Sequence, residues 1–324
     1  MRNSSEPVAV IAWKDKDGIG GKIEVGQDGR PRVEFSAAGG PRDADARGKP
    51  DGRFELSVSL AHGAAAADMT SPTATTRSAE LYLDLMKNCL TRLVFQESGP
   101  PIHPDFREFD PRARTEGRDW PADAETMIGI YRLSNLQNCV TDIIARKVPG
   151  DLIETGVWRG GATIFMKAIL EAYEDTTRTV WVADSFEGMP LANPDRYPHD
   201  RGMEYQANFR ELAVSIEAVK TNFARYGLLD DRVQFLKGWF KDTLPDAPIT
   251  SLALIRLDGD LYESTIDALN ALYPKLSPGG YVIVDDYNLF DACRAAVDDY
   301  RRDHGIQDHI ESIDWSGVFW RRSY

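Results

Sequence analysis

Four aspartates stand in two pairs, and each pair directly follows an apolar run. Asp258 and Asp260 follow SLALIRL, while Asp285 and Asp286 follow GGYVIV. If these runs are neighbouring strands of one sheet, the four carboxylates meet at one edge and repel one another. A hard divalent cation resolves that repulsion, and Mg²⁺ favours such oxygen ligands. One aspartate at a strand end is most simply a turn or cap residue, but four across two adjacent ends point to a metal site.

Such a cluster is suited to activating an alcohol. A divalent cation lowers the pKa of a coordinated hydroxyl, and a nearby carboxylate can take the proton. The cation also orients a vicinal diol toward a reacting group. Three of the aspartates can then be ligands while the fourth remains free as a base. Asp258 and Asp260 are two residues apart and point to the same side if the strand continues.

A glycine-containing turn earlier in the chain has features of a nucleoside site. An apolar strand ends in Glu154-Thr155-Gly156, and Gly160 opens the helix that follows. Without Cβ atoms, the backbone can approach a ligand closely. Trp158 occupies the middle position of the dinucleotide fingerprint, which counts against a pyrophosphate cradle. A nucleoside cofactor without phosphate remains compatible, although a glycine turn alone is equally compatible with a structural role.

The next two strand ends supply further groups for a nucleoside. Asp184 and Ser185 follow the run VWVA, about one β-α-β unit after Gly156. A carboxylate there can accept both ribose hydroxyls, and the alternative is a cap or loop aspartate. Gly238 and Trp239 follow the run RVQFLK, where the indole either stacks on an adenine or packs in the core.

The elements that would position these residues alternate between strand and helix. Strands are expected in the runs DLIET, TVWVAD, RVQFLK, SLALIRL and GGYVIV, and helices over 162–173, 212–226, STIDALNALYPKL and 291–302. Pro278-Gly279-Gly280 is expected to end the third helix. A closing hairpin turns at 315–317. This predicts an α/β fold of the class I methyltransferase type, Rossmann-like with a mostly parallel seven-stranded sheet, whose ligands bind at the carboxyl ends of the strands.

Residues 151–324 are therefore the predicted methyltransferase domain, and 79–150 a helical cap that contributes to the site. In the cap, Ser78 is expected to be the N-cap of a helix that places Leu81, Leu85, Cys89 and Leu93 on one face. A second helix is expected through ETMIGIYRLSNLQNCVTDIIARK, ending before Pro149-Gly150. The polar stretch 187–210 is expected to be a long loop or a lid.

Residues 1–78 form an additional N-terminal segment. The alternating runs VAVIAW, KIEV, RVEF and FELSVSL, with Asp-Gly turns between them, predict β-hairpins. Three interpretations remain open: a small β-module, a largely disordered leader, or a segment upstream of the natural start.

Composition excludes several classes of partner. Lys plus Arg is 38 and Asp plus Glu is 51, a net charge of −13, so nucleic acid is a poor partner. No stretch approaches the roughly 20 apolar residues that cross a bilayer. The cysteines, Cys89, Cys139 and Cys293, have no zinc spacing and are expected to be reduced. No signal-peptide pattern opens the chain, and a cytoplasmic protein is predicted.

The motifs in this order resemble the macrocin O-methyltransferase family. The resemblance is carried by GDLIETGVWRGGATIFMKAIL, VWVADSFEGMP, LIRLDGDLYEST and PGGYVIVDDY, and it covers about residues 79–324. Members methylate sugars on macrolide antibiotics, and relatives act on the deoxysugar of aminocoumarins. The resemblance implies S-adenosylmethionine as donor, Mg²⁺, a glycosylated small-molecule acceptor and a homodimer.

The resemblance also implies a role for each motif residue. Asp258, Asp285 and Asp286 would hold Mg²⁺, and Asp260 would be the general base. The residues implied to contact the cofactor are Glu154, Thr155, Gly156, Gly160, Asp184, Ser185, Gly238 and Trp239.

Three alternatives compete with a sugar O-methyltransferase. A catechol-type enzyme would use the same metal and base on an aromatic diol. A nucleoside-binding scaffold without catalysis would act through residues 1–78, but the intact aspartate set argues against it. An NAD(P) oxidoreductase is disfavoured by Trp158 in the fingerprint.

Overall fold

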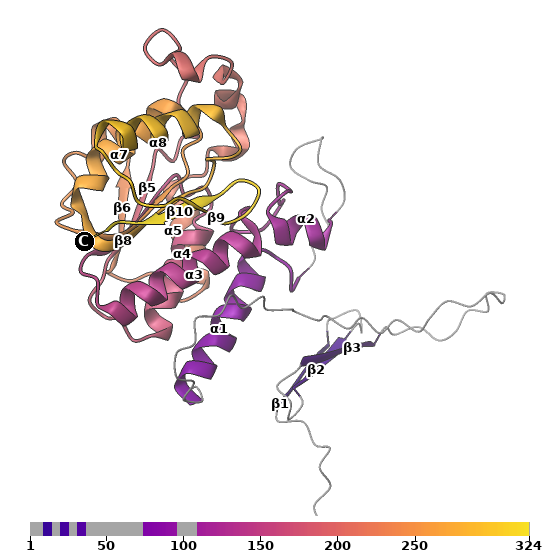
Figure 1. Ribbon diagram of the computed structural model, residues 1–324. Helices are drawn as coiled ribbons and strands as arrows, with labels where there is room; N and C mark the ends of the chain where they lie inside the picture. Colours follow the sequence, from indigo (N-terminus) through magenta and orange to yellow (C-terminus); the bar gives the residue numbers. More distant parts are fainter. Residues whose placement is uncertain (1–8, 15–19, 26–30, 37–73, 96–108, 324) are drawn as a thin grey trace, which may run out of the picture. The chain divides into compact units, whose positions relative to one another are not determined.

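The computed structural model divides the chain into two units. In the first unit, residues 1–70, it describes a three-stranded antiparallel sheet. The structure as a whole describes residues 9–14, 20–25, 31–36, 74–95 and 109–323 (Figure 1). The strands are β1 (Ala9–Lys14), β2 (Gly20–Val25) and β3 (Pro31–Ser36), with β2 in the centre. The antiparallel pairing of β1 with β2 and of β2 with β3 is the strand arrangement expected of the first two predicted hairpins, whose turns lie outside the described residues. The run FELSVSL lies outside the described residues.

The second unit, residues 71–324, contains a seven-stranded sheet. Its strands are β4 (Asp151–Thr155), β5 (Val180–Asp184), β6 (Val233–Lys237), β7 (Leu252–Leu257), β8 (Leu276–Val284), β9 (Glu311–Ser312) and β10 (Val318–Arg321). Their order is β6-β5-β4-β7-β8-β10-β9. The first five run parallel, and β10 pairs antiparallel with both β8 and β9. This confirms the predicted sheet, including the hairpin that inserts an antiparallel strand.

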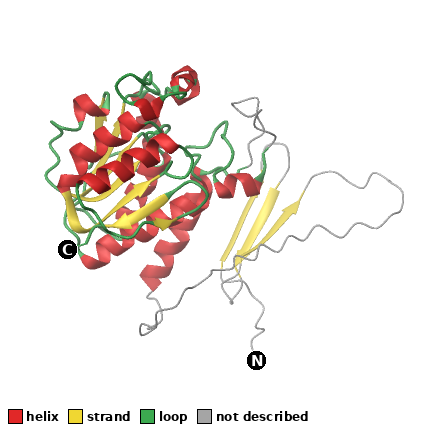
Figure 2. Cartoon of the chain, turned by 45° about the horizontal axis from the view of Figure 1, so that its top comes forward, coloured by secondary structure: helices red, strands yellow, loops and turns green. Residues whose placement is uncertain are grey.

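Helices cover both faces of this sheet (Figure 2). They are α1 (Ala74–Leu90), α2 (Pro111–Glu116), α3 (Gly129–Arg146), α4 (Gly161–Ala172), α5 (Ile216–Arg225), α6 (Phe240–Thr243), α7 (Tyr262–Leu272) and α8 (Asp291–Asp303). Helices α1, α3, α4 and α5 contribute to one apolar core, and α7 and α8 to the other. Every residue of β7 is buried, which explains why its sequence is almost continuously apolar.

The stretch between β5 and α5 contains three 3₁₀ helices. They are η1 (Pro198–Asp200), η2 (Glu204–Asn208) and η3 (Arg210–Leu212). Residues 187–210, called the lid below, therefore have short ordered turns within a long connection. Another 3₁₀ helix, η4 (Tyr273–Lys275), follows α7 directly.

Two local predictions were wrong. Helix α1 begins at Ala74 rather than after Ser78, and Leu81 and Leu85 are 59% and 56% exposed. Its buried stripe is instead Ala79, Leu83, Met86 and Leu90, because the helix has two apolar faces and only this one packs into the core shared with α3 and α4.

The second error concerns Pro278-Gly279-Gly280, which lies inside β8 and does not end a helix. The β7–β8 register shifts between Leu252 and Leu254, opposite this stretch. Proline and glycine are tolerated in a strand at such an irregularity. Within the described ranges, no helix has the length and apolar character needed to cross a membrane.

Candidate active site

Backbone hydrogen bonds continue beyond the carboxyl ends of the parallel strands and keep these ends aligned at one edge of the sheet. The amide of Asp258 donates to the Thr155 carbonyl at 2.9 Å, and the amide of Asp285 donates to the Leu257 carbonyl at 2.9 Å. On the other side of β4, the Gly156 amide donates to Ala183 at 2.9 Å. Loops that lie far apart in the sequence therefore leave the same sheet edge side by side.

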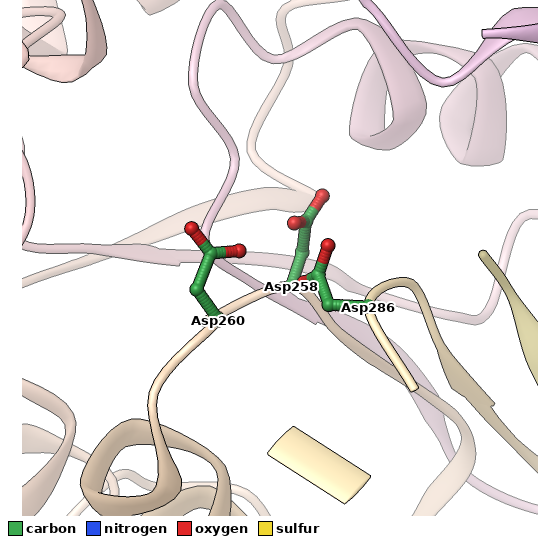
Figure 3. Close-up of side chains that lie close together, drawn as sticks. All are labelled: Asp258, Asp260 and Asp286. Atoms are coloured by element: carbon green, nitrogen blue, oxygen red, sulfur yellow. The ribbon is translucent and has the colours of Figure 1, made fainter. Parts of the chain in front are cut away.

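Three carboxylates meet at this edge. Asp258, Asp260 and Asp286 each offer an oxygen, and these oxygens lie within 4.8 Å of one another (Figure 3). Asp260 does not arrive there by continuing the strand, which ends at Leu257. The chain turns instead, with a left-handed φ of +55° at Asp260. A non-glycine residue keeps that backbone conformation when its surroundings hold it, and such residues concentrate at functional sites.

Asp285 lies in a clamp of two buried arginines. One oxygen accepts a hydrogen bond from Arg256 in β7, and the other accepts one from Arg132 in α3. Arg256 also donates to Glu154 and, at 2.7 Å, to Asp258, so one guanidinium contacts three carboxylates. Asp285 thus joins the cluster through Arg256, while Asp260 joins it directly.

Sequence reasoning missed both arginines. Arg256 had a visible signal, because it is the single charged residue in the otherwise apolar strand LALIRL. Arg132 is buried on the inner side of α3, where a charged side chain requires a partner. Its Nε donates to Asp314 at 3.1 Å, which also ties the β9–β10 hairpin to the site.

Burial and like charge make the acidic cluster unfavourable in its fully ionised state. They raise the pKa of Asp258 to about 6 and that of Asp260 to about 7. The pKa of Asp286 is raised well above its ordinary value by burial and by Asp260. Burial also raises the pKa of Glu154 to about 8, despite the opposing effect of Arg256. A divalent cation would stabilise the ionised forms of these carboxylates.

The donor set fits a hard divalent cation. Oxygen ligands from carboxylates are what Mg²⁺ selects. In addition, the Oδ2 atom of Asp286 is buried and has no hydrogen-bond partner among the described residues. A buried carboxylate oxygen left without a donor is costly, and a bound cation removes that cost.

Two adjoining cavities open at the same sheet edge. The first, of about 330 Å³, is lined by Gly156, Asp184, Ser185, Gly238 and Trp239, together with residues of the lid and of the α6 and α7 starts. The second, of about 470 Å³, is lined by all four aspartates of the cluster and by several aromatic side chains. Gly156, Asp184 and Asp258 line both cavities, so a ligand in one abuts a ligand in the other.

The remaining predicted cofactor residues lie apart from the first cavity. Thr155 is buried within β4, and Gly160 precedes α4 without lining either cavity. Glu154 lines the second cavity and binds Arg256. Asp184 does line the first cavity, but its carboxylate also accepts from the amides of Val157 and Phe186, both at 2.7 Å.

Gly156 lies at a point of very close approach. Its φ is +83°, and a Cβ added there would overlap the backbone oxygen of Asp258. The glycine therefore lets the β4 end and the β7 end sit against each other where the two cavities meet.

The lid and the cap cover the second cavity with aromatic rings. Phe209 packs edge-on against Trp120 with ring centroids 5.5 Å apart, and against Tyr205 at 5.8 Å. All three rings line the second cavity. The sequence contained these residues without a motif that would single them out.

Comparison with known proteins gives consistent matches to residues beyond the first unit. A model of the family described as Macrocin-O-methyltransferase (TylF) matches residues 79–322. The chain is 58% identical over 246 residues to the 8-demethyl-8-(2,3-dimethoxy-alpha-L-rhamnosyl)-tetracenomycin-C 4'-O-methyltransferase of Streptomyces olivaceus, covering 75% of this chain and 93% of that protein.

Two further relatives extend the match. The chain is 52% identical over 250 residues to the Mycinamicin III 3''-O-methyltransferase of Micromonospora griseorubida, covering 75% of this chain and 97% of that protein. The solved structure of the O-methyltransferase NovP is 54% identical with a TM-score of 0.72, and the match covers 76% of this chain and 100% of that chain.

Proposed function

This chain belongs to the macrocin O-methyltransferase family, and on that premise we propose that it methylates a ring hydroxyl of a sugar on a glycosylated natural product. It is an S-adenosylmethionine-dependent O-methyltransferase. The sugar acceptor is supported by relatives named for a rhamnosyl 4'-hydroxyl and a mycinamicin 3''-hydroxyl. The observation that carries the proposal is that Asp258, Asp260 and Asp286 form a cluster that lines the second cavity, and that this cavity adjoins the first.

S-adenosylmethionine is proposed to occupy the first cavity. Asp184 and Ser185 would receive the ribose, and Trp239 would stack on the adenine, with Gly156 and Gly238 giving room for close contact. When bound, it supplies a methyl group already activated on a sulfonium. Glu154, Thr155 and Gly160, which are also predicted to contact the cofactor, belong to the same strand end and turn. Glu154 accepts a hydrogen bond from Arg256, and the Thr155 carbonyl accepts one from the amide of Asp258.

Mg²⁺ is proposed to be held by Asp258, Asp285 and Asp286. Asp258 and Asp286 already bring oxygens together, and Asp286 has the orphaned Oδ2 atom. Asp285 is engaged by two arginines, but each carboxylate oxygen has two lone pairs, so it can also serve a cation. When bound, the ion lowers the pKa of an acceptor hydroxyl and orients it.

Asp260 is proposed to be the general base. Its carboxylate lies in the second cavity beside the proposed ligands, where an acceptor hydroxyl would face the first cavity. Bound S-adenosylmethionine would supply the methyl group to the acceptor oxygen, with its sulfur as the leaving group. Asp260 takes the hydroxyl proton. The products are a methyl ether and a neutral thioether.

The second cavity suits an acceptor with both polar and apolar parts. It is lined both by the acidic cluster and by the aromatic rings of Trp120, Tyr205 and Phe209. Sugar hydroxyls would face the carboxylates, while the apolar face of the sugar and the attached aglycone would contact the rings.

Isotope-labelled methyl transfer tests the proposal. The purified protein should pass label from S-adenosylmethionine to an aromatic rhamnoside, lose this activity with chelator and regain it with Mg²⁺. A catechol acceptor in parallel tests the acceptor class. Transfer to catechol but to no glycoside would contradict the proposal, and so would full activity in chelator.

We also propose a homodimer that works in the cytoplasm. Support for the dimer is the row of exposed apolar side chains on α1: Leu81, Tyr82 and Leu85. Support for the compartment is that Cys89, Cys139 and Cys293 are all free.

A further inference from the structure

The lid carries a buried amide side chain into the active site. Gln206, in η2, is only 3% exposed, whereas its neighbours Tyr205 and Ala207 are exposed. Its Nε2 atom donates to the Oδ2 atom of Asp260 at 3.0 Å. Its Oε1 atom is buried and has no hydrogen-bond partner among the described residues. One half of the amide is therefore used and the other half is not, and Gln206 is one of the residues that line the second cavity.

The lid makes a second contact with the short segment that runs from Asp260 to Glu263. Asp200, fully buried in η1, accepts from the backbone amides of Tyr262 at 2.6 Å and Glu263 at 3.1 Å. These amides lie just beyond Asp260, at the start of α7. Because Asp260 has a left-handed backbone, its position depends on such contacts. The lid thus fixes Asp260 through its side chain and through the backbone that follows it.

An unpaired buried acceptor is costly unless a ligand supplies a donor. We propose that the Oε1 atom of Gln206 accepts a hydrogen bond from an acceptor hydroxyl next to the one that is methylated, while its Nε2 atom positions Asp260. This inference rests on the proposed function, since it needs a polyhydroxylated acceptor in the second cavity. Gln206 is then both an acceptor-binding and a positioning residue, and it links the position of the lid to the orientation of the base.

Two variants of Gln206 test the inference against a matched control. Gln206→Met keeps an unbranched side chain of similar length but removes both polar atoms, and Gln206→Asn keeps the amide but withdraws it. Asn208→Met alters an exposed residue of the same 3₁₀ helix. We expect a roughly tenfold or greater loss of kcat in both Gln206 variants, because a misplaced base is costly. Affinity for S-adenosylmethionine, measured by calorimetry, and the thermal midpoint should stay unchanged, as should all parameters of Asn208→Met.

The contact between Gln206 and an acceptor hydroxyl is isolated by a double-perturbation cycle, in which the side chain is changed in the enzyme and a hydroxyl is removed from the acceptor. Binding of an aromatic rhamnoside, and of analogues that each lack one ring hydroxyl, is measured with S-adenosylhomocysteine present. For one analogue, the wild-type protein should bind about tenfold more weakly than it binds the complete rhamnoside. Gln206→Met should bind that analogue and the complete rhamnoside equally well. Equal losses in both proteins for every analogue, or wild-type kcat and KM in Gln206→Met, would overturn this inference alone. A wild-type protein that neither binds nor methylates any glycoside would overturn the proposed function as well.

Discussion

At the scale of single residues, the proposed chemistry depends on which carboxylate takes the proton. Asp260→Asn keeps the size of the side chain and its contact with Gln206 but removes the base. We expect methyl transfer to fall by a factor on the order of 10² to 10⁴, the usual contribution of a general base. S-adenosylmethionine binding, measured by calorimetry, should be preserved. Turnover close to that of the wild type would remove Asp260 from the mechanism.

The choice of metal ligands is a second residue-scale question, because Asp260 and Asp285 are both near the cluster. Mn²⁺ binding followed by electron paramagnetic resonance separates them. Asp285→Asn and Asp286→Asn should both weaken Mn²⁺ affinity by about tenfold or more, whereas Asp260→Asn should leave it within a few-fold. If Asp285 serves only as counter-ion to Arg132 and Arg256, its variant will keep Mn²⁺ affinity but unfold at lower temperature.

The raised pKa values predict how stability depends on pH. Folding raises the pKa of Asp258 to about 6, of Asp260 to about 7 and of Glu154 to about 8, from ordinary values of 3.8 and 4.5. Between these limits the folded state binds more protons than the unfolded state, so stability falls as pH rises. In chelator, we expect the thermal midpoint to decline from about pH 4 to about pH 8.

Mg²⁺ provides the control for that titration. A bound cation stabilises the ionised carboxylates, so the decline should be reduced in its presence, and the stabilisation by Mg²⁺ should grow with pH. The measurement is thermal unfolding across this range with and without the ion. A decline of the same size in both conditions would contradict a metal site at these residues.

At the scale of elements, the lid is attached to the start of α7 because a lid residue, Asp200, caps that helix. Helix α7 has no side-chain cap from its own preceding residue, and Asp200 of the lid satisfies its first amides instead. Asp200→Ala should cost about 1 kcal/mol of stability, as loss of a helix cap does. It should also raise KM for the acceptor while leaving S-adenosylmethionine affinity unchanged.

Limited proteolysis measures directly whether Asp200 holds the lid in place. In Asp200→Ala, cleavage within the lid should become faster. The effect should be absent from Asp195→Ala, because Asp195 is an exposed lid residue that makes no hydrogen bond to α7 in the described part of the chain. Unchanged cleavage in the lid together with an unchanged KM would show that the contact between Asp200 and α7 does not hold the lid in place.

At the scale of the whole molecule, the proposed homodimer depends on the outer face of α1. Leu81 and Leu85 are more than half exposed, although each is a large apolar residue. Leu85→Lys should halve the mass measured by light scattering and leave the fold intact, because the buried stripe with Leu83 is untouched. A monomeric wild-type protein, or a dimeric Leu85→Lys protein, would contradict this interface.

Much of this molecule follows from its sequence because the relevant signals are local. Apolar runs alternating with helical periodicity predicted the parallel strands and their helices, and Asp258, Asp285 and Gly156 could be placed at strand ends from their position after such runs. Parallel strands then fix a common edge, so the meeting of acidic and cofactor residues was predictable in outline.

Other features depend on contacts between distant segments, which periodicity does not encode. Helix α1 has two apolar faces, and only packing selected the one that is buried. Asp260 enters the cluster through a left-handed turn rather than along a strand, and Asp285 is turned into a clamp by Arg132, which lies 153 residues away in the sequence. The sequence by itself determined the fold, the strand-end positions and the types of chemical groups. Tertiary structure decided which oxygens face one another, because charge balance and burial act on atoms brought together only by the folded chain.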